Sequence, residues 1–101
     1  MEKFVKAAQA EQELRWAGIW FKQFSAFHQR HSQTDWEFNR DDVIRFLQSK
    51  RDAKVPAWKR MRIIEGLMVF REQVQNRSAE DLVPLQSKMV EIIAIERARD
   101  D

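Results

Sequence analysis

The chain has 101 residues, of which 44% are hydrophobic and 34% charged, and its formal net charge is +2. This length fits one domain, residues 1–101, that can bury a single core without cross-links, and the absence of cysteine excludes disulfides and thiolate metal sites and agrees with a cytoplasmic protein. With two glycines, two prolines, mostly helix-forming residues and no apolar run long enough to span a bilayer, the sequence predicts a soluble all-α fold with no membrane partner.

The positive charge is concentrated in the middle of the chain. Residues 1–14 hold two basic and three acidic side chains (−1), residues 15–77 hold thirteen and seven (+6), and residues 78–101 hold three and six (−3). The densest part, between positions 50 and 62, has six cations and one acid. Such a cluster is either an interface for an anionic partner or an ordinary solvated surface.

The first core helix is expected over residues 11–31. Its apolar stripe consists of Trp16, Trp20, Phe24, Phe27 and His31, with Ala17, Phe21 and His28 beside it. Aromatic side chains at this spacing are more typical of a core than of a surface on which bases stack. Gly18 inside this helix costs about 1 kcal/mol relative to alanine, which close packing of another backbone would offset. Residues 1–10 are either a helical extension or a loosely ordered arm.

A connection and a second helix follow. Residues 32–40 contain Trp36 and Phe38, which we expect to pack onto the helices and fix the connection. The N-capping residue types Asn39, Asp41 and Asp42 then predict a short amphipathic helix over residues 41–52. It ends in a basic run, and the residue before Pro56 favours extended geometry, so the chain should break sharply there.

The third helix, expected over residues 56–74, organises the chain. Pro56 suits the first turn of a helix. Ile63, Leu67, Phe70 and Val74, with Ile64 and Met68 beside them, form its core-facing stripe. Basic residues crowd its first turns, where Arg60 flanks the stripe, and this arrangement favours an incoming anion over the stability of the helix itself.

The remaining residues, 78–101, predict a last helix. Ser78 with Asp81 resembles a capping box, and Pro84 either kinks or restarts the helix. The apolar stripe consists of Leu82, Leu85, Met89, Ile92 and Ile93, and it is expected to end before the charged residues 96–101.

No catalytic, metal or cofactor site is predicted. His28 and His31 lie one turn apart but lack carboxylates at helical spacing to complete a ligand set, and we expect His28 to donate to a backbone carbonyl. The serines have no nucleophile-elbow or triad context.

Three stretches carry a resemblance to a known family. They are residues 20–28 (WFKQFSAFH), 42–47 (DVIRFL) and 55–71, which end in GLMVFR. In this order they resemble the N-terminal core-binding domain of tyrosine recombinases and phage integrases, in particular the integron type, over about residues 14–77. The resemblance implies a SAM-like bundle of four to five helices that grips a recombination site in double-stranded DNA during DNA integration and recombination. Residues 78–101 would then lead towards a separate catalytic domain.

The resemblance also implies where DNA would bind. In that family the first and third helices cross over the major groove, and the parent recombinases act as tetramers of protomers. With the basic run, this gives the candidate DNA-binding residues Arg15, Lys22, Lys50, Arg51, Lys54, Trp58, Lys59, Arg60 and Arg62. Residues 56–58 (PAW) replace the family's small polar residue, so these side chains would have to supply its DNA contact. The chain contains no tyrosine, and we therefore expect this part of a recombinase to be non-catalytic.

Two other functions remain open from the sequence. The first is a helical protein–protein interaction domain, in which the basic centre pairs with the acidic last helix of another copy. The second is a small enzyme or an RNA-binding helical domain without a recognisable motif. A salt-dependent affinity for DNA would distinguish the predicted DNA-binding function from protein interaction.

Overall fold

The computed structural model describes the backbone of residues 2–100 and the side chains of residues 11–99. Within this part the chain is all-helical, as predicted. Its elements are α1 (Glu2–Phe27), α2 (Arg40–Asp52), α3 (Ala57–Gln73), the 3-10 helix η1 (Glu80–Leu82) and α4 (Val83–Asp100). Within residues 2–100, no helix combines the length and the apolar composition needed to cross a membrane.

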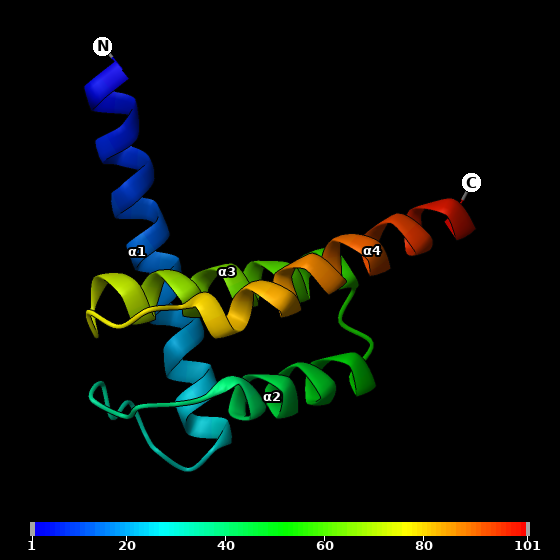
Figure 1. Cartoon of the computed structure of the whole chain (residues 1–101), viewed down its shortest axis with the longest axis horizontal. Coiled ribbons are helices and arrows are strands. Elements are labelled where there is room, and N and C mark those ends of the chain that lie inside the picture. The colour runs from blue at the N-terminus through cyan, green and yellow to red at the C-terminus, as the bar shows by residue number, and fades with distance from the viewer. Residues whose placement is uncertain (1, 101) are drawn as a thin grey trace.

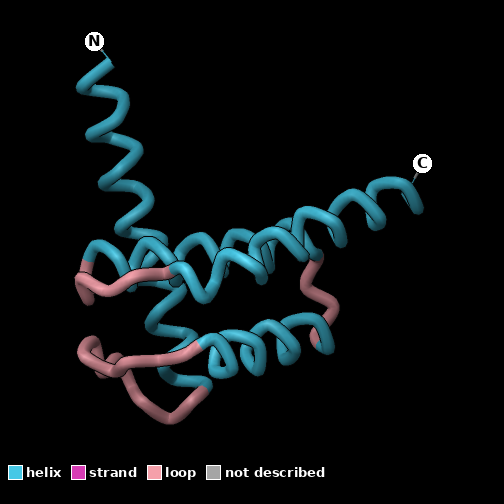
Figure 2. The backbone as a smooth tube through the Cα atoms, in the orientation of Figure 1, coloured by secondary structure: helices cyan, strands magenta, loops and turns pink. Residues whose placement is uncertain are grey.

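Helix α3 is the central element and contacts α1, α2 and α4. Helix α1 runs across the direction of the other three, and its N-terminal half extends beyond them (Figure 1). Helix α3 runs opposite to α2 and α4. The connections before α2 and after α3 therefore lie together at one end, and the α2–α3 connection lies at the other end (Figure 2).

Helix α1 includes residues 2–10, so this segment is the helical extension. The helix ends at Phe27, four residues before the predicted end. Gln29, His31 and Ser32 have positive φ, and the Ser25 hydroxyl accepts a hydrogen bond from the Ser32 N–H at 2.9 Å. The left-handed turn stops the helix, and His31 is exposed outside the core stripe rather than within it.

One apolar core lies between α1, α2 and α3, and α4 closes one side of it. Phe21 of α1 stacks on Phe70 of α3 with ring centroids 3.9 Å apart. The buried face of α1 is rotated from the predicted stripe, because Phe21 is 2% exposed whereas Trp16 and Phe27 are 49% and 44% exposed. The core residues are Ala17, Phe21, Phe24, Trp36, Phe38, Val43, Phe46, Leu47, Ala57, Ile63, Ile64, Leu67, Phe70, Leu82 and Met89.

The connection before α2 packs onto this core as predicted. Trp36 and Phe38 are both buried. Asn39 caps α2, and its side chain and that of Asp42 each accept the other's backbone N–H at 2.9 Å. His28 is half-buried, and its Nε2 donates to the Asp42 carbonyl oxygen at 2.8 Å, which confirms the expected role of this histidine.

A buried arginine joins the end of α3 to this connection and to η1. Arg71 is 1% exposed, donates to the Phe38 carbonyl oxygen at 2.7 Å and pairs with the Asp81 carboxylate. Burial lowers the pKa of Arg71, and the charge of Asp81 opposes this effect. Asp81 therefore neutralises a buried cation and does not serve the predicted capping box. The Ser78 hydroxyl accepts instead from the Glu80 N–H at 3.2 Å.

Helix α4 and the preceding η1 pack against α3 and the core. Leu82 and Met89 are buried, and Leu85, Ile92 and Ile93 pack against the core, so the predicted stripe is confirmed. The stripe ends at Ile93, before the charged residues, as predicted, and the helix itself continues through these residues to Asp100. These residues remain helical in part because one of them, Glu96, contacts the start of α3.

Candidate nucleic-acid interface

The turn between α2 and α3 places a lysine where glycine is usual. Lys54 has φ of 64°, its N–H donates to the Arg51 carbonyl oxygen at 2.9 Å, and the Val55 N–H donates to the Lys50 carbonyl oxygen at 2.9 Å. This pair of bonds is the Schellman ending of a helix, whose left-handed position favours glycine. The chain therefore holds an exposed cation at a strained position of the turn.

The other two cations of this turn are partly engaged. Lys50 is half-buried, with its Nζ 5.2 Å from the centre of the Phe46 ring. Arg51 is exposed and pairs with the neighbouring Asp52 at 3.5 Å. Lys50 and Lys54 thus remain available to an anion, whereas Arg51 already has a partner.

Helix α3 begins beside this turn and exposes three of its predicted site residues. Trp58 is 54% exposed, and Lys59 and Arg62 are also exposed. The Lys59 Nζ lies 6.0 Å from the centre of the Trp58 ring. Among the side chains of residues 11–99, neither Lys59 nor Arg62 forms an ion pair.

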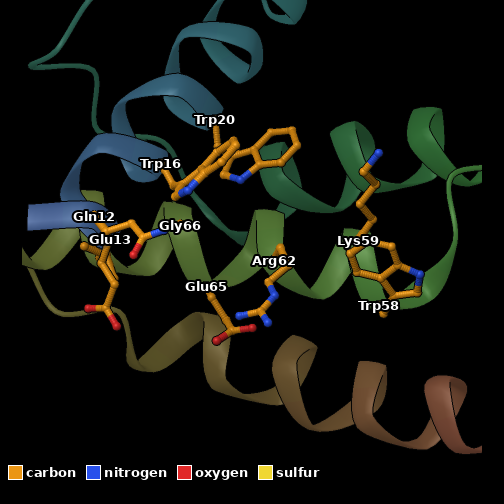
Figure 3. Close-up of a pocket in the computed structure, with 10 residues that line it drawn as sticks. Gln12, Glu13, Trp16, Trp20, Trp58, Lys59, Arg62, Glu65 and Gly66 are labelled. Carbon is orange, nitrogen blue, oxygen red and sulfur yellow. The ribbon is translucent and has the colours of Figure 1, made fainter. Parts of the chain in front are cut away.

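An open cleft lies where α1 crosses this part of α3 (Figure 3). Its volume is about 860 Å³. Trp16 and Trp20 lie on its α1 side, with their ring planes inclined by 28° and their centroids 6.4 Å apart. The aromatic stripe predicted both tryptophans to lie in the core; Trp20 is partly buried and packs against it, whereas Trp16 is 49% exposed and lines the cleft. The residues lining the cleft are Gln12, Glu13, Trp16, Trp20, Trp58, Lys59, Arg62, Glu65, Gly66 and Val69.

Gly66 sets how closely the two helices approach at the cleft. A Cβ atom at this position would lie 2.8 Å from Cδ1 of Trp20, which is closer than carbon atoms pack. Gly18, the position at which the sequence predicted close packing, has nothing within 4 Å of such an atom. The glycine that permits the close approach is therefore in α3 and not in α1.

The charge inside the cleft is balanced. Lys59 and Arg62 contribute two positive charges, and Glu13 and Glu65 contribute two negative charges. Arg62 and Glu65 point towards one another in Figure 3. The excess of positive charge beside the cleft therefore comes from Lys50 and Lys54 in the turn before α3, which do not line it.

Arg60 does not belong to this exposed group. It is 8% exposed, and its Nη2 lies 3.5 Å from Oε1 of Glu96 in α4. Arg60 was predicted to flank the core stripe and to bind DNA; its side chain is buried because α4 packs over the side of α3 on which it lies.

Arg15 and Lys22 are exposed on α1, but neither lines the cleft. Along a helix they lie roughly 100° or more from Trp16 and Trp20. The structure therefore does not join them to the basic end of α3, and their part in an interface stays a prediction.

Other chemistry is not indicated by the described side chains. Among residues 11–99, no three His, Cys, Asp or Glu side chains lie close enough together to hold a metal ion. His28 is engaged with the backbone of α2 and His31 is exposed in the turn after α1.

Comparison with protein-family models, with curated proteins and with solved structures finds no match to this chain.

Proposed function

We propose that this chain is a non-catalytic DNA-binding domain of a site-specific tyrosine recombinase, and that its helices form the SAM-like bundle of that family. The observation that carries the proposal is the exposed basic end of α3. Lys59 and Arg62 lie there beside exposed Trp58 and next to the turn that holds Lys50 and Lys54. We call these four cations the basic end.

The basic end suits the backbone of a duplex. Cations without an ion-pair partner lose little when they bind phosphates, and they release the counterions condensed on DNA. Trp58 supplies an exposed ring that can pack against a sugar or a base edge. In this proposal the α1–α3 crossing faces the duplex, and other protomers of a recombinase tetramer are the protein partners.

A titration with duplex DNA at several salt concentrations tests the proposal. If the four cations each neutralise one phosphate, log K should fall with log[salt] at a slope of about −3.6. An affinity that does not change with salt, or no binding at low salt, would contradict it.

Charge substitutions separate the basic end from a diffuse positive surface. Lys59→Ala and Arg62→Ala should each weaken binding and make the salt slope shallower by about 0.9. The matched controls are Lys88→Ala and Arg97→Ala, which remove the same charge from exposed positions of α4. Equal losses in both pairs would show that DNA responds only to net charge.

The second candidate function is protein–protein interaction, and one exposed side of α4 favours it. Val83 and Val90 lie two turns apart on the same side of this helix and are 44% and 57% exposed. If this face is the functional surface, the chain should self-associate in a way that salt does not weaken, as measured by sedimentation equilibrium, and Val90→Lys should abolish the association.

A further inference from the structure

The start of α3 is capped by a side chain from α4. The first N–H groups of a helix have no acceptor within the helix, and Pro56, in the N-cap position, makes no side-chain hydrogen bond. The N–H of Ala57 donates instead to Oε2 of Glu96 at 3.2 Å. Glu96 lies 39 positions later in the chain than Ala57. A carboxylate from the last helix thus occupies the place where an anion binds a helix N-terminus.

Arg60 pairs with the other oxygen of the same carboxylate. Its Nη2 lies 3.5 Å from Oε1 of Glu96, so each carboxylate oxygen has one partner. The Arg60 side chain is more than nine-tenths buried, and its Nε has no hydrogen-bond partner. Buried guanidinium groups rarely leave a donor unused. The Glu96 carboxylate, which pairs with Nη2 at 3.5 Å, leaves the Nε–H of Arg60 without an acceptor.

A phosphate group matches these donors better than the carboxylate does. It offers more acceptor oxygens to an arginine fork and a helix N-terminus, the two groups that most often bind phosphate. The Glu96 side chain is 41% exposed, so solvent reaches the carboxylate. An anion can therefore replace it without opening the part of α4 anchored by Met89.

We propose that the Ala57 N–H and Arg60 form a phosphate-binding site whose resident occupant is Glu96. The end of α4 then acts as an intramolecular competitor, because the site accepts a phosphate group only when Glu96 leaves. The inference rests on the proposed function in one respect, since in a DNA-binding domain the phosphate belongs to the duplex backbone. The site adds a DNA contact at the start of α3, next to the basic end.

The first test uses inorganic phosphate and NMR of the whole chain. Glu96→Asp shortens the competing side chain without changing net charge, and Glu96→Gln removes its charge. In both variants phosphate should shift the Ala57 N–H and the Arg60 Nε–H signals saturably, at a phosphate concentration about fivefold lower than in the unmodified chain. The control Glu91→Gln removes a charge from an exposed position of α4 and should behave as the unmodified chain does.

Two results would overturn the inference. One is that the Glu96 variants respond to phosphate no better than Glu91→Gln. The other is that the response persists when Arg60→Met is added to Glu96→Asp. Urea unfolding of each variant confirms that it is folded before titration, and Glu96→Asp serves if the loss of charge in Glu96→Gln unfolds the chain.

A titration with duplex DNA is the second test, and its outcomes distinguish failure of this inference from failure of the proposed function. Glu96→Asp should bind duplex about fivefold more tightly than the unmodified chain. If the duplex binds both equally, the competitor role is refuted while DNA binding stands. If phosphate binds as expected but neither protein binds the duplex, the phosphate site stands with a free phosphate as its ligand, and the proposed function fails.

Discussion

Two glycines in different helices should respond in opposite ways to the same substitution. Gly18 of α1 has open space around the position of an added Cβ, whereas an added Cβ on Gly66 of α3 would lie 2.8 Å from Cδ1 and 3.5 Å from Cβ of Trp20. Both glycines are inside helices and neither has positive φ. Replacement by alanine therefore changes helix propensity equally and differs only in packing.

The magnitudes follow from these contacts. Alanine gains about 1 kcal/mol over glycine inside a helix, so Gly18→Ala should stabilise the chain by about that amount. At Gly66 the same gain is opposed by an overpacking cost of about 1–3 kcal/mol, because the indole of Trp20 must move. The free energies of unfolding of the two variants should then differ by about 1–3 kcal/mol, which is at least roughly 4–8 °C in Tm for a domain of this size.

Urea unfolding measures both variants, and a double-mutant cycle identifies the cause. Trp20→Ala removes the ring that Gly66→Ala would strike, so in that background the alanine at position 66 should become stabilising. The reasoning is refuted if Gly66→Ala is as stable as Gly18→Ala, or if the cost of Gly66→Ala is unchanged when Trp20 is absent.

Three further substitutions test the core, the buried ion pair and the basic turn. Phe70→Ala should lower the free energy of unfolding by about 3–5 kcal/mol, whereas Val74→Ala, at a position that is 46% exposed, should cost far less; similar urea midpoints for the two would show that α3 is not central. Asp81→Ala leaves Arg71 buried without its carboxylate and should cost about 1–3 kcal/mol, and a fully stable variant in thermal unfolding would count against the pairing. Lys54→Gly relieves the left-handed position and should stabilise the chain by roughly 1 kcal/mol while weakening duplex binding, so an unchanged DNA affinity would remove Lys54 from the interface.

The sequence alone determined the helical class and most helix boundaries. Asn39 with Asp42 fixes the start of α2, and Pro56 fixes the start of α3, because caps and proline act on the neighbouring backbone and need no distant partner. Periodicity correctly identified the core stripe of α4 and that of α3 except for Val74, which follows the last residue of α3 and is 46% exposed. The burial of Trp36 and Phe38 followed from their being large apolar side chains in a short connection. The hydrogen bond from His28 to a backbone carbonyl followed from the need of a buried ring nitrogen for a partner.

Only the tertiary structure decided which side of each helix meets which neighbour. Helix α1 carries aromatic side chains over a wide arc, so periodicity could not choose between Trp16 and Phe21; the crossing with α3 buries Phe21 and leaves Trp16 exposed in the cleft. The same dependence on distant residues governs Arg60, whose exposure is set by α4. A sequence gives the spacing of side chains along a helix, but the direction in which that face points depends on contacts between residues far apart in the chain.

In the candidate interface, too, some features are determined by the sequence and others only by the tertiary structure. The composition of residues 50–62 identified the basic cluster, because charge is a local property of the sequence. Which of its cations remain available is decided by Glu96 and by the packing of α4 over α3, and the close approach at Gly66 depends on Trp20 of another helix. These are contacts between separate helices, and their energies depend on sub-ångström distances that no pattern along a single chain specifies.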